Sequence, residues 1–274
     1  MKHPLFILLA AAVALTACED VVDLDVPEAP PRVVVDGRVT NHLDSQTVRL
    51  TYSTPYFDNR TPPPITGATV EIADDEGVTV ALTETAPGYY KALFAGTAGR
   101  VYTLRFTTPE GRSYTSQPER LNRVTAIDSL AVVNQDSLPF AEDGYYVRLF
   151  AQEPGETEDY YFWRWSINGE IEDDPSEVQW AADDFVNGRP IRDFQLNFEP
   201  FEVDDEILVE QLGITPEFYE FISILFEQTN RGGLFDPPPA PVPGNVFNVA
   251  DDEEKVLGYF YAAGYTDQTV IIEP

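Results

Sequence analysis

The sequence predicts a mainly β protein: an N-terminal immunoglobulin-like β-sandwich, then a second β-rich, sandwich-like domain with one inserted α-helix. Three observations predict this class. Short runs that alternate apolar and polar residues recur between turn signals along most of the chain. A helical period of apolar residues stands out near residues 215–229. A pause in the strand pattern at residues 118–123 separates two such regions, which indicates a domain boundary.

Residues 1–17 are typical of a bacterial lipoprotein signal peptide. Lys2 and His3 give a basic start, and residues 5–15 are apolar, a length that suits a signal peptide but is too short to span a bilayer. The next residues, Leu-Thr-Ala-Cys ending at Cys18, resemble a lipobox, in which the Cys receives a diacylglycerol and becomes the first mature residue. An ordinary secreted protein with an incidental Cys is the alternative. We therefore expect lipid attachment at Cys18, with the lipid bilayer as a partner.

Residues 18–31 are acidic and then rich in proline, which is typical of a tether. Residues 32–118 follow as the predicted immunoglobulin-like sandwich, with turn signals such as Asp74-Asp75-Glu76-Gly77 between its strands. Its expected strands are 32–40, 47–53, 68–73, 78–82, 89–94, 101–107 and 113–116.

Residues 124–274 form the predicted second domain, with longer and more acidic loops. Its expected strands are 126–133, 145–152, 159–167, 191–198, 206–212, 256–262 and 269–272. The helix near 215–229 has Thr215 as a natural N-cap and Pro216 at the first helical position. Its apolar stripe, which we expect to pack into this domain, consists of Phe218, Phe221, Ile222 and Leu225.

Composition excludes several kinds of function. The formal net charge of -30 repels phosphate backbones, so we expect no nucleic-acid partner. Once Cys18 carries lipid, no thiol remains for a disulfide or a nucleophile. His42 is the one histidine of the mature chain, and it sits in a polar turn, so zinc sites built on several His or Cys ligands and a Ser-His-Asp triad are both disfavoured. We assign no catalytic residue and no cofactor, and we expect that the chain is not an enzyme.

Two features remain as candidate sites. In a strand, Tyr161, Trp163 and Trp165 share one face, which favours a patch for a ligand or partner; the alternative is a core strand packed between layers. Paired acids such as Asp183-Asp184 and Asp204-Asp205 offer oxygen ligands for calcium. Because no D-x-[DN]-x-[DN]-G loop is present, we interpret these acids as solvated surface and assign no metal site.

The order of several short motifs resembles a bacterial lipoprotein family called domain of unknown function 4249. The motifs lie at residues 18–24 (CEDVVDL), 33–40 (VVVDGRVT), 67–70 (GATV), 88–90 (GYY), 99–104 (GRVYTL), 243–248 (PGNVFN) and 257–260 (LGYF). The resemblance implies a chain of the Bacteroidetes type, similar to accessory lipoproteins encoded beside TonB-dependent outer-membrane transporters. It implies no catalytic residues. In that bacterial group, acids directly after the lipidated Cys resemble a signal for export to the cell surface, and Glu19-Asp20 match it.

On this basis we expect a surface-exposed, lipid-anchored outer-membrane protein facing the cell exterior. It would act as a non-enzymatic binding or accessory subunit of a TonB-dependent uptake system, with the transporter as partner. A structural or adhesive envelope protein, stabilised by calcium, is the alternative. An enzyme with a carboxylate pair for glycoside hydrolysis is a third possibility, which the sequence does not locate on any two residues.

Overall fold

The computed structural model describes residues 30–55, 58, 60–136, 142–172, 174, 177–183, 187–229 and 242–274. Cys18, the expected signal peptide and nearly all of the expected tether lie outside the described residues. Pro31–Pro274 form one compact unit. Among the described residues, no helix has the length and apolar character needed to cross a membrane.

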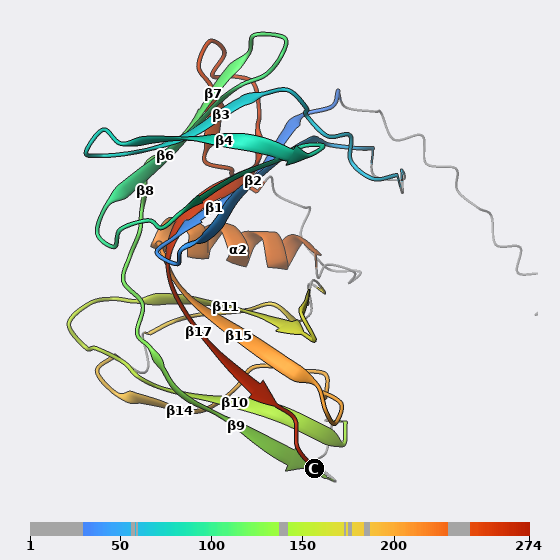
Figure 1. Cartoon of the computed structure of the whole chain (residues 1–274), viewed down its shortest axis with the longest axis vertical. Helices are drawn as coiled ribbons and strands as arrows, with labels where there is room; N and C mark the ends of the chain where they lie inside the picture. Colours follow the sequence, from blue (N-terminus) through green and yellow to red (C-terminus); the bar gives the residue numbers. More distant parts are fainter. Residues whose placement is uncertain are drawn as a thin grey trace, which may run out of the picture. The chain divides into compact units, whose positions relative to one another are not determined.

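The first part of the chain is a β-sandwich, as predicted (Figure 1). All seven strands expected in residues 32–116 are present. They are β1 (Val33–Thr40), β2 (Asp44–Tyr52), β3 (Thr69–Asp74), β4 (Thr79–Ala86), β5 (Tyr89–Phe94), β6 (Val101–Thr107) and β7 (Ser113–Ser116), and the short β8 (Glu119–Arg120) follows. Alternate residues point inward, as in β1, where Val33, Val35 and Val39 are buried in a core shared with Leu50 and Leu104.

The second part is also β-rich, and its core lies between two groups of strands. One group is the antiparallel sheet β14-β10-β9, and the other contains β11, β15 and β17 (Figure 1). The elements are β9 (Ile127–Gln135), β10 (Gly144–Gln152), β11 (Tyr160–Ile167), β12 (Glu170–Ile171), β13 (Gln179–Ala182), β14 (Pro190–Gln195), β15 (Glu206–Ile214), α2 (Pro216–Thr229), β16 (Val246–Asn248) and β17 (Leu257–Ile271). The short strands β8, β12, β13 and β16 were not expected from the sequence.

Strand β17 joins the two parts of the fold. The sequence predicts two strands here, 256–262 and 269–272, whereas the structure has one continuous strand of 15 residues. Its first half pairs in parallel with β1, and its second half pairs antiparallel with β15. The predicted division into residues 32–118 and 124–274 stays a prediction. Two strands from the end of the chain nevertheless pair with strands of the first part: β17 pairs with β1, and β16 pairs with β7.

Two paired glycines let residues 122–124, which connect the two parts of the fold, pass close over strands β15 and β17. Gly213 of β15 lies opposite Gly264 of β17. A Cβ atom on Gly213 would lie 2.6 Å from the backbone oxygen of Arg123, and one on Gly264 would lie 2.5 Å from that of Asn122. Any side chain at either position would therefore push the segment away from the strands.

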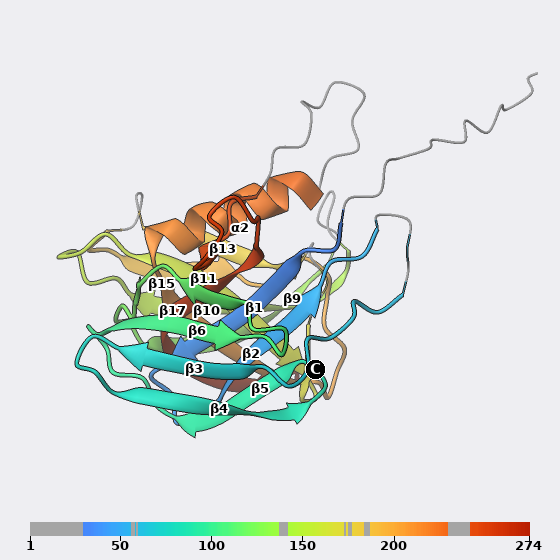
Figure 2. The ribbon, with the colours of Figure 1, turned by 90° about the horizontal axis from the view of Figure 1, so that it is seen from above.

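Helix α2 confirms the helix predicted near residues 215–229. The N-cap is present, because the Phe218 amide donates a hydrogen bond to Thr215 Oγ1 at 3.3 Å. Figure 2 shows the helix along one side of the strands, where Phe218 and Ile222 are buried against β15 and β17. The expected apolar stripe is corrected at its end: Phe221 is half-buried and Leu225 is 42% exposed, because both side chains line an open groove beside the core.

Candidate functional site

The aromatic run of β11 forms core rather than surface. Tyr161, Trp163 and Trp165 are 2%, 2% and 3% exposed, and they pack between the two groups of strands in the second part of the chain. Trp163 Nε1 donates a hydrogen bond to Gln211 Oε1 at 2.9 Å, and its ring lies 4.6 Å from that of Phe194. The expectation of a ligand or partner patch is therefore corrected, and the alternative of a core strand accounts for these residues. Both faces of β11 are covered, one by this core and the other by α2.

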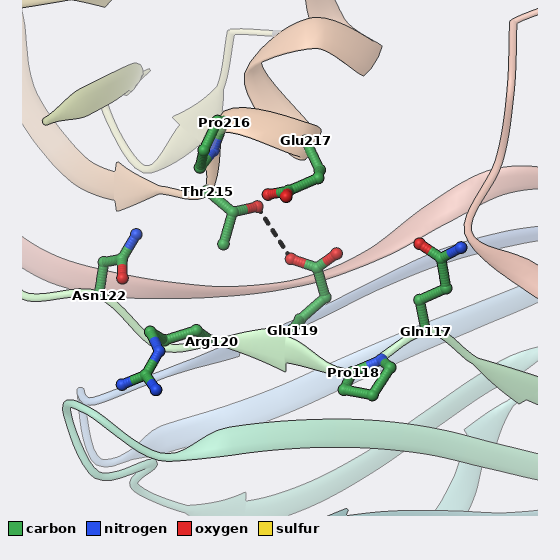
Figure 3. Close-up of a pocket in the computed structure, with 8 residues that line it drawn as sticks. All are labelled: Gln117, Pro118, Glu119, Arg120, Asn122, Thr215, Pro216 and Glu217. Carbon is green, nitrogen blue, oxygen red and sulfur yellow. Dashed lines mark hydrogen bonds between the residues drawn. The ribbon is translucent and has the colours of Figure 1, made fainter. Parts of the chain in front are cut away.

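A buried carboxylate, Glu119, lies where the two parts of the fold meet (Figure 3). It stands on β8 and accepts hydrogen bonds from Thr215 Oγ1 at 2.9 Å, Asn245 Nδ2 at 3.0 Å and the Tyr259 hydroxyl at 2.8 Å. These donors come from the N-cap of α2, the residue before β16, and β17. Asn245 also exchanges two hydrogen bonds with the backbone of Phe260, which fixes its orientation. Glu119 therefore holds four segments together that are far apart in the sequence.

The electrostatics of Glu119 reflect its burial. Desolvation raises the pKa of this carboxyl group above its usual range, the three donors act in the opposite direction, and the nearby charge of Glu217 raises it further. Desolvation and the charge of Glu119 likewise raise the pKa of Tyr259. Arg120 does not neutralise Glu119, because its side chain points away and donates to Gly99 O at 2.8 Å (Figure 3). Both Glu119 oxygens are occupied by donors of the fold, which indicates a structural role.

The cavity beside Glu119 has a volume of about 600 Å³. It is lined by Gln117, Pro118, Glu119, Arg120, Asn122, Thr215, Pro216 and Glu217 (Figure 3). Because the one buried acid in it is already saturated with hydrogen bonds, the cavity offers no free buried polar group to a substrate. This junction could not be predicted from the sequence, because Glu119 follows Pro118 in a segment that resembles a linker.

An apolar groove lies along α2. It has a volume of about 490 Å³, and its walls come from α2, β1 and the start of β17. Phe221 and Leu225 line it from the helix, Val34 lines it from β1, and Tyr259 lines it from β17. Asp36, which is exposed, lies at its margin. Its apolar walls offer a concave surface to a binding partner.

The residues that could hold a metal lie elsewhere, at one end of the second core. Glu153, Asp159 and Asp183 each offer a carboxylate oxygen, and these oxygens lie within 4.8 Å of one another. Of the paired acids noted in the sequence, Asp183 contributes to this group. His42, the one histidine of the expected mature chain, stacks on Tyr265 with ring centroids 4.7 Å apart.

Comparison with known proteins gives a family and little beyond it. The family described as Domain of unknown function (DUF4249) matches residues 19–269. No curated protein matches the chain. Among solved structures, a two-domain fibronectin type-III segment from chicken tenascin is similar at 14% identity and a TM-score of 0.19, over 67% of this chain and 90% of that one. Because the family match extends over almost the entire sequence, the chain belongs to the DUF4249 family.

Proposed function

We propose that the chain is a non-enzymatic accessory subunit of a TonB-dependent uptake system, anchored to the outer membrane through lipid on Cys18 and facing the cell exterior. The apolar groove beside α2 supports this proposal from the structure. The lipobox and the family resemblance support the anchor and the transporter from the sequence. Binding, rather than catalysis, also fits Glu119, whose oxygens are all engaged in holding the fold.

The groove indicates the chemistry of the partner. Its walls of Phe221, Leu225, Val34 and Tyr259 suit apolar side chains, and Leu225 is 42% exposed at its edge. The exposed Asp36 at the margin and the formal net charge of -30 repel an acidic partner. We therefore propose that the occupant is a transporter segment that combines apolar side chains with neighbouring Lys or Arg residues.

Site-specific photo-crosslinking in the native bacterium tests this proposal. A photoreactive amino acid at position 225 should crosslink to a TonB-dependent transporter, identified by mass spectrometry. The same amino acid at Leu93, which is 71% exposed on β5, is the matched control and should not crosslink to it. Cys18→Ala should release the chain from the membrane fraction and abolish the crosslink. Crosslinks at position 225 to other chains only, or none at all, would refute the docking surface.

The alternative, a structural or adhesive envelope protein stabilised by calcium, also has support from a specific observation. Glu153, Asp159 and Asp183 bring three carboxylate oxygens within 4.8 Å of one another, and carboxylate oxygens are ligands that calcium takes. Deletion of the gene separates the two functions. Loss of cell adhesion with uptake unchanged would favour the structural protein, and loss of uptake with adhesion unchanged would favour the accessory subunit.

A further inference from the structure

Three carboxylates meet where three strands of the second part begin or end. Glu153 directly follows β10, Asp159 directly precedes β11, and Asp183 directly follows β13. Because Tyr160 of β11 lies opposite Ala182 of β13, the two aspartates are neighbours, and the Asp183 amide donates to Asp159 O at 3.0 Å. One oxygen from each of the three carboxylates lies within 4.8 Å of the others. The pairing of the strands thus concentrates three acids in one place.

Two oxygens of this group are buried without a partner. Glu153 is 1% exposed and Asp183 is 3% exposed. Among the described residues, Glu153 Oε1 and Asp183 Oδ2 have no hydrogen-bond partner. The other Glu153 oxygen accepts from the Tyr161 hydroxyl at 2.5 Å. A buried polar atom without a partner is rare in folded proteins and calls for a bound water or ion.

The charge of the group is also uncompensated within the described part of the chain. No Lys or Arg of the described residues forms an ion pair with any of the three acids. A carboxylate that stays charged when buried is normally paired with a cation or bound to a metal.

The surrounding loops hold the acids in position. Thr157 Oγ1 donates to Asp159 Oδ2 at 2.7 Å. Asn187 links the loop after β13 to the loop before β11. Its backbone N–H donates to Asp183 O at 2.8 Å, and its side-chain Nδ2 donates to Thr157 O at 3.1 Å. Gly155 and Gly188 allow the loops to touch: both have positive φ angles, and a Cβ on Gly155 would lie 2.6 Å from Gly188 Cα.

We propose that Glu153, Asp159 and Asp183 form a calcium-binding site. The donors are carboxylate oxygens, which suit hard cations, and the group contains no His or Cys. Calcium accepts six to eight oxygens in irregular geometry, so three carboxylates with water can satisfy it, whereas magnesium demands a near-ideal octahedron. The bound ion would tie the end of β10 to the ends of β11 and β13. This inference does not depend on the transporter partnership, and it gives residues to the structural alternative.

Thermal unfolding of the full-length, detergent-solubilised protein tests the site after treatment with a chelator. Calcium chloride should raise the melting temperature by about 5 °C or more at a hundredfold excess over Kd. The rise should saturate, and the chelator should reverse it. Sodium chloride at the same ionic strength should give a smaller, unsaturated rise by screening the net charge. A calcium effect no larger than that of sodium, or a magnesium effect equal to that of calcium, would overturn the proposal.

Glu153→Gln is the decisive variant, because glutamine keeps an acceptor for Tyr161 but removes the charge. The variant should lose the calcium-specific rise in melting temperature. In chelator it should melt at the same temperature as the wild-type protein or at a higher one. Asp252→Asn, in the exposed acidic stretch after β16, is the matched control and should keep the full rise. If Glu153→Gln does not fold, Asp159→Asn at the half-buried position gives the same test. A calcium rise that persists in these site variants would overturn the assignment.

Discussion

Two buried glutamates, Glu119 and Glu153, occupy opposite kinds of surroundings in the same chain. They are 3% and 1% exposed, and desolvation is the main cause that raises the pKa of both carboxyl groups. Glu119 accepts hydrogen bonds from three side chains. Glu153 accepts from Tyr161, leaves its other oxygen unpartnered, and faces two further acids.

The partners of a buried carboxylate distinguish a structural acid from a binding acid. Burial alone does not do so, since both carboxylates are buried and both have raised pKa values. The donors decide: an acid whose oxygens are all occupied by the fold stabilises that fold, whereas an acid with a free oxygen beside like charges needs a proton or a cation to neutralise it. Removing each side chain should therefore have different consequences.

Loss of the Glu119 side chain should lower the free energy of unfolding more than any other change considered. Glu119→Ala leaves Thr215, Asn245 and Tyr259 without their acceptor, and each unsatisfied buried group costs about 1–3 kcal/mol, so the free energy of unfolding should fall by at least about 3 kcal/mol. Glu153→Ala, measured in chelator, leaves only the Tyr161 hydroxyl unpaired and relieves repulsion, so it should cost about 1 kcal/mol or less. Chemical denaturation of the two variants measures both values. Equal losses would contradict the distinction between the two acids.

A somewhat smaller effect is expected from the helix that supplies a donor to Glu119. Phe218 is 5% exposed, stacks on Tyr261 with centroids 4.0 Å apart, and lies in the first turn of α2. Phe218→Ala should lower the free energy of unfolding by about 3 kcal/mol through the cavity it creates. Leu225→Ala, on the same helix but at the exposed edge of the groove, should cost less than about 1 kcal/mol. A loss at Leu225 as large as that at Phe218 would show that the groove edge belongs to the core.

Much of the fold follows from local patterns in the sequence. Alternation predicted the seven strands of the first part, and the N-cap at Thr215 with the apolar stripe predicted α2. The continuous β17 was missed because Gly264 and the polar residues after it resemble a break. In the structure, the close crossing of residues 122–124 accounts for that glycine. Local pattern cannot show which distant segment will pass over a strand.

Neither buried glutamate could be identified from the sequence. Glu119 meets a partner 140 residues away, Tyr259, and the pairing of β11 with β13 places Asp183 beside Asp159. Among 47 acidic residues, nothing local distinguishes these from the exposed ones. The aromatic run of β11 illustrates the same limit, because alternation predicted a shared face for Tyr161, Trp163 and Trp165 but could not decide whether another layer covered it.

A smaller change is expected in how the free energy of unfolding depends on pH. It tests whether burial raises the pKa of Glu119 more than its three hydrogen-bond donors lower it. Its pKa in the folded protein lies above the unfolded value of 4.5, with desolvation as the largest cause and Glu217 adding to it. The folded state therefore binds a proton more readily than the unfolded state. The penalty for burying the charge is fully present above the folded pKa, and it is lost as the pH falls through that pKa toward 4.5.

Glu119→Gln removes this titration while keeping an acceptor for Tyr259 and Asn245 and a group that can bond Thr215. The free energy of unfolding of the wild-type protein, minus that of the variant, should rise as the pH is lowered from 8 toward about 4.5. Other acids titrate in both proteins, so the difference isolates Glu119. Urea unfolding of both proteins across this pH range measures it. A difference that falls toward low pH would mean that the three donors stabilise the charge more than burial opposes it, and the two glutamates would then differ in the sign of their pKa shifts as well as in their partners.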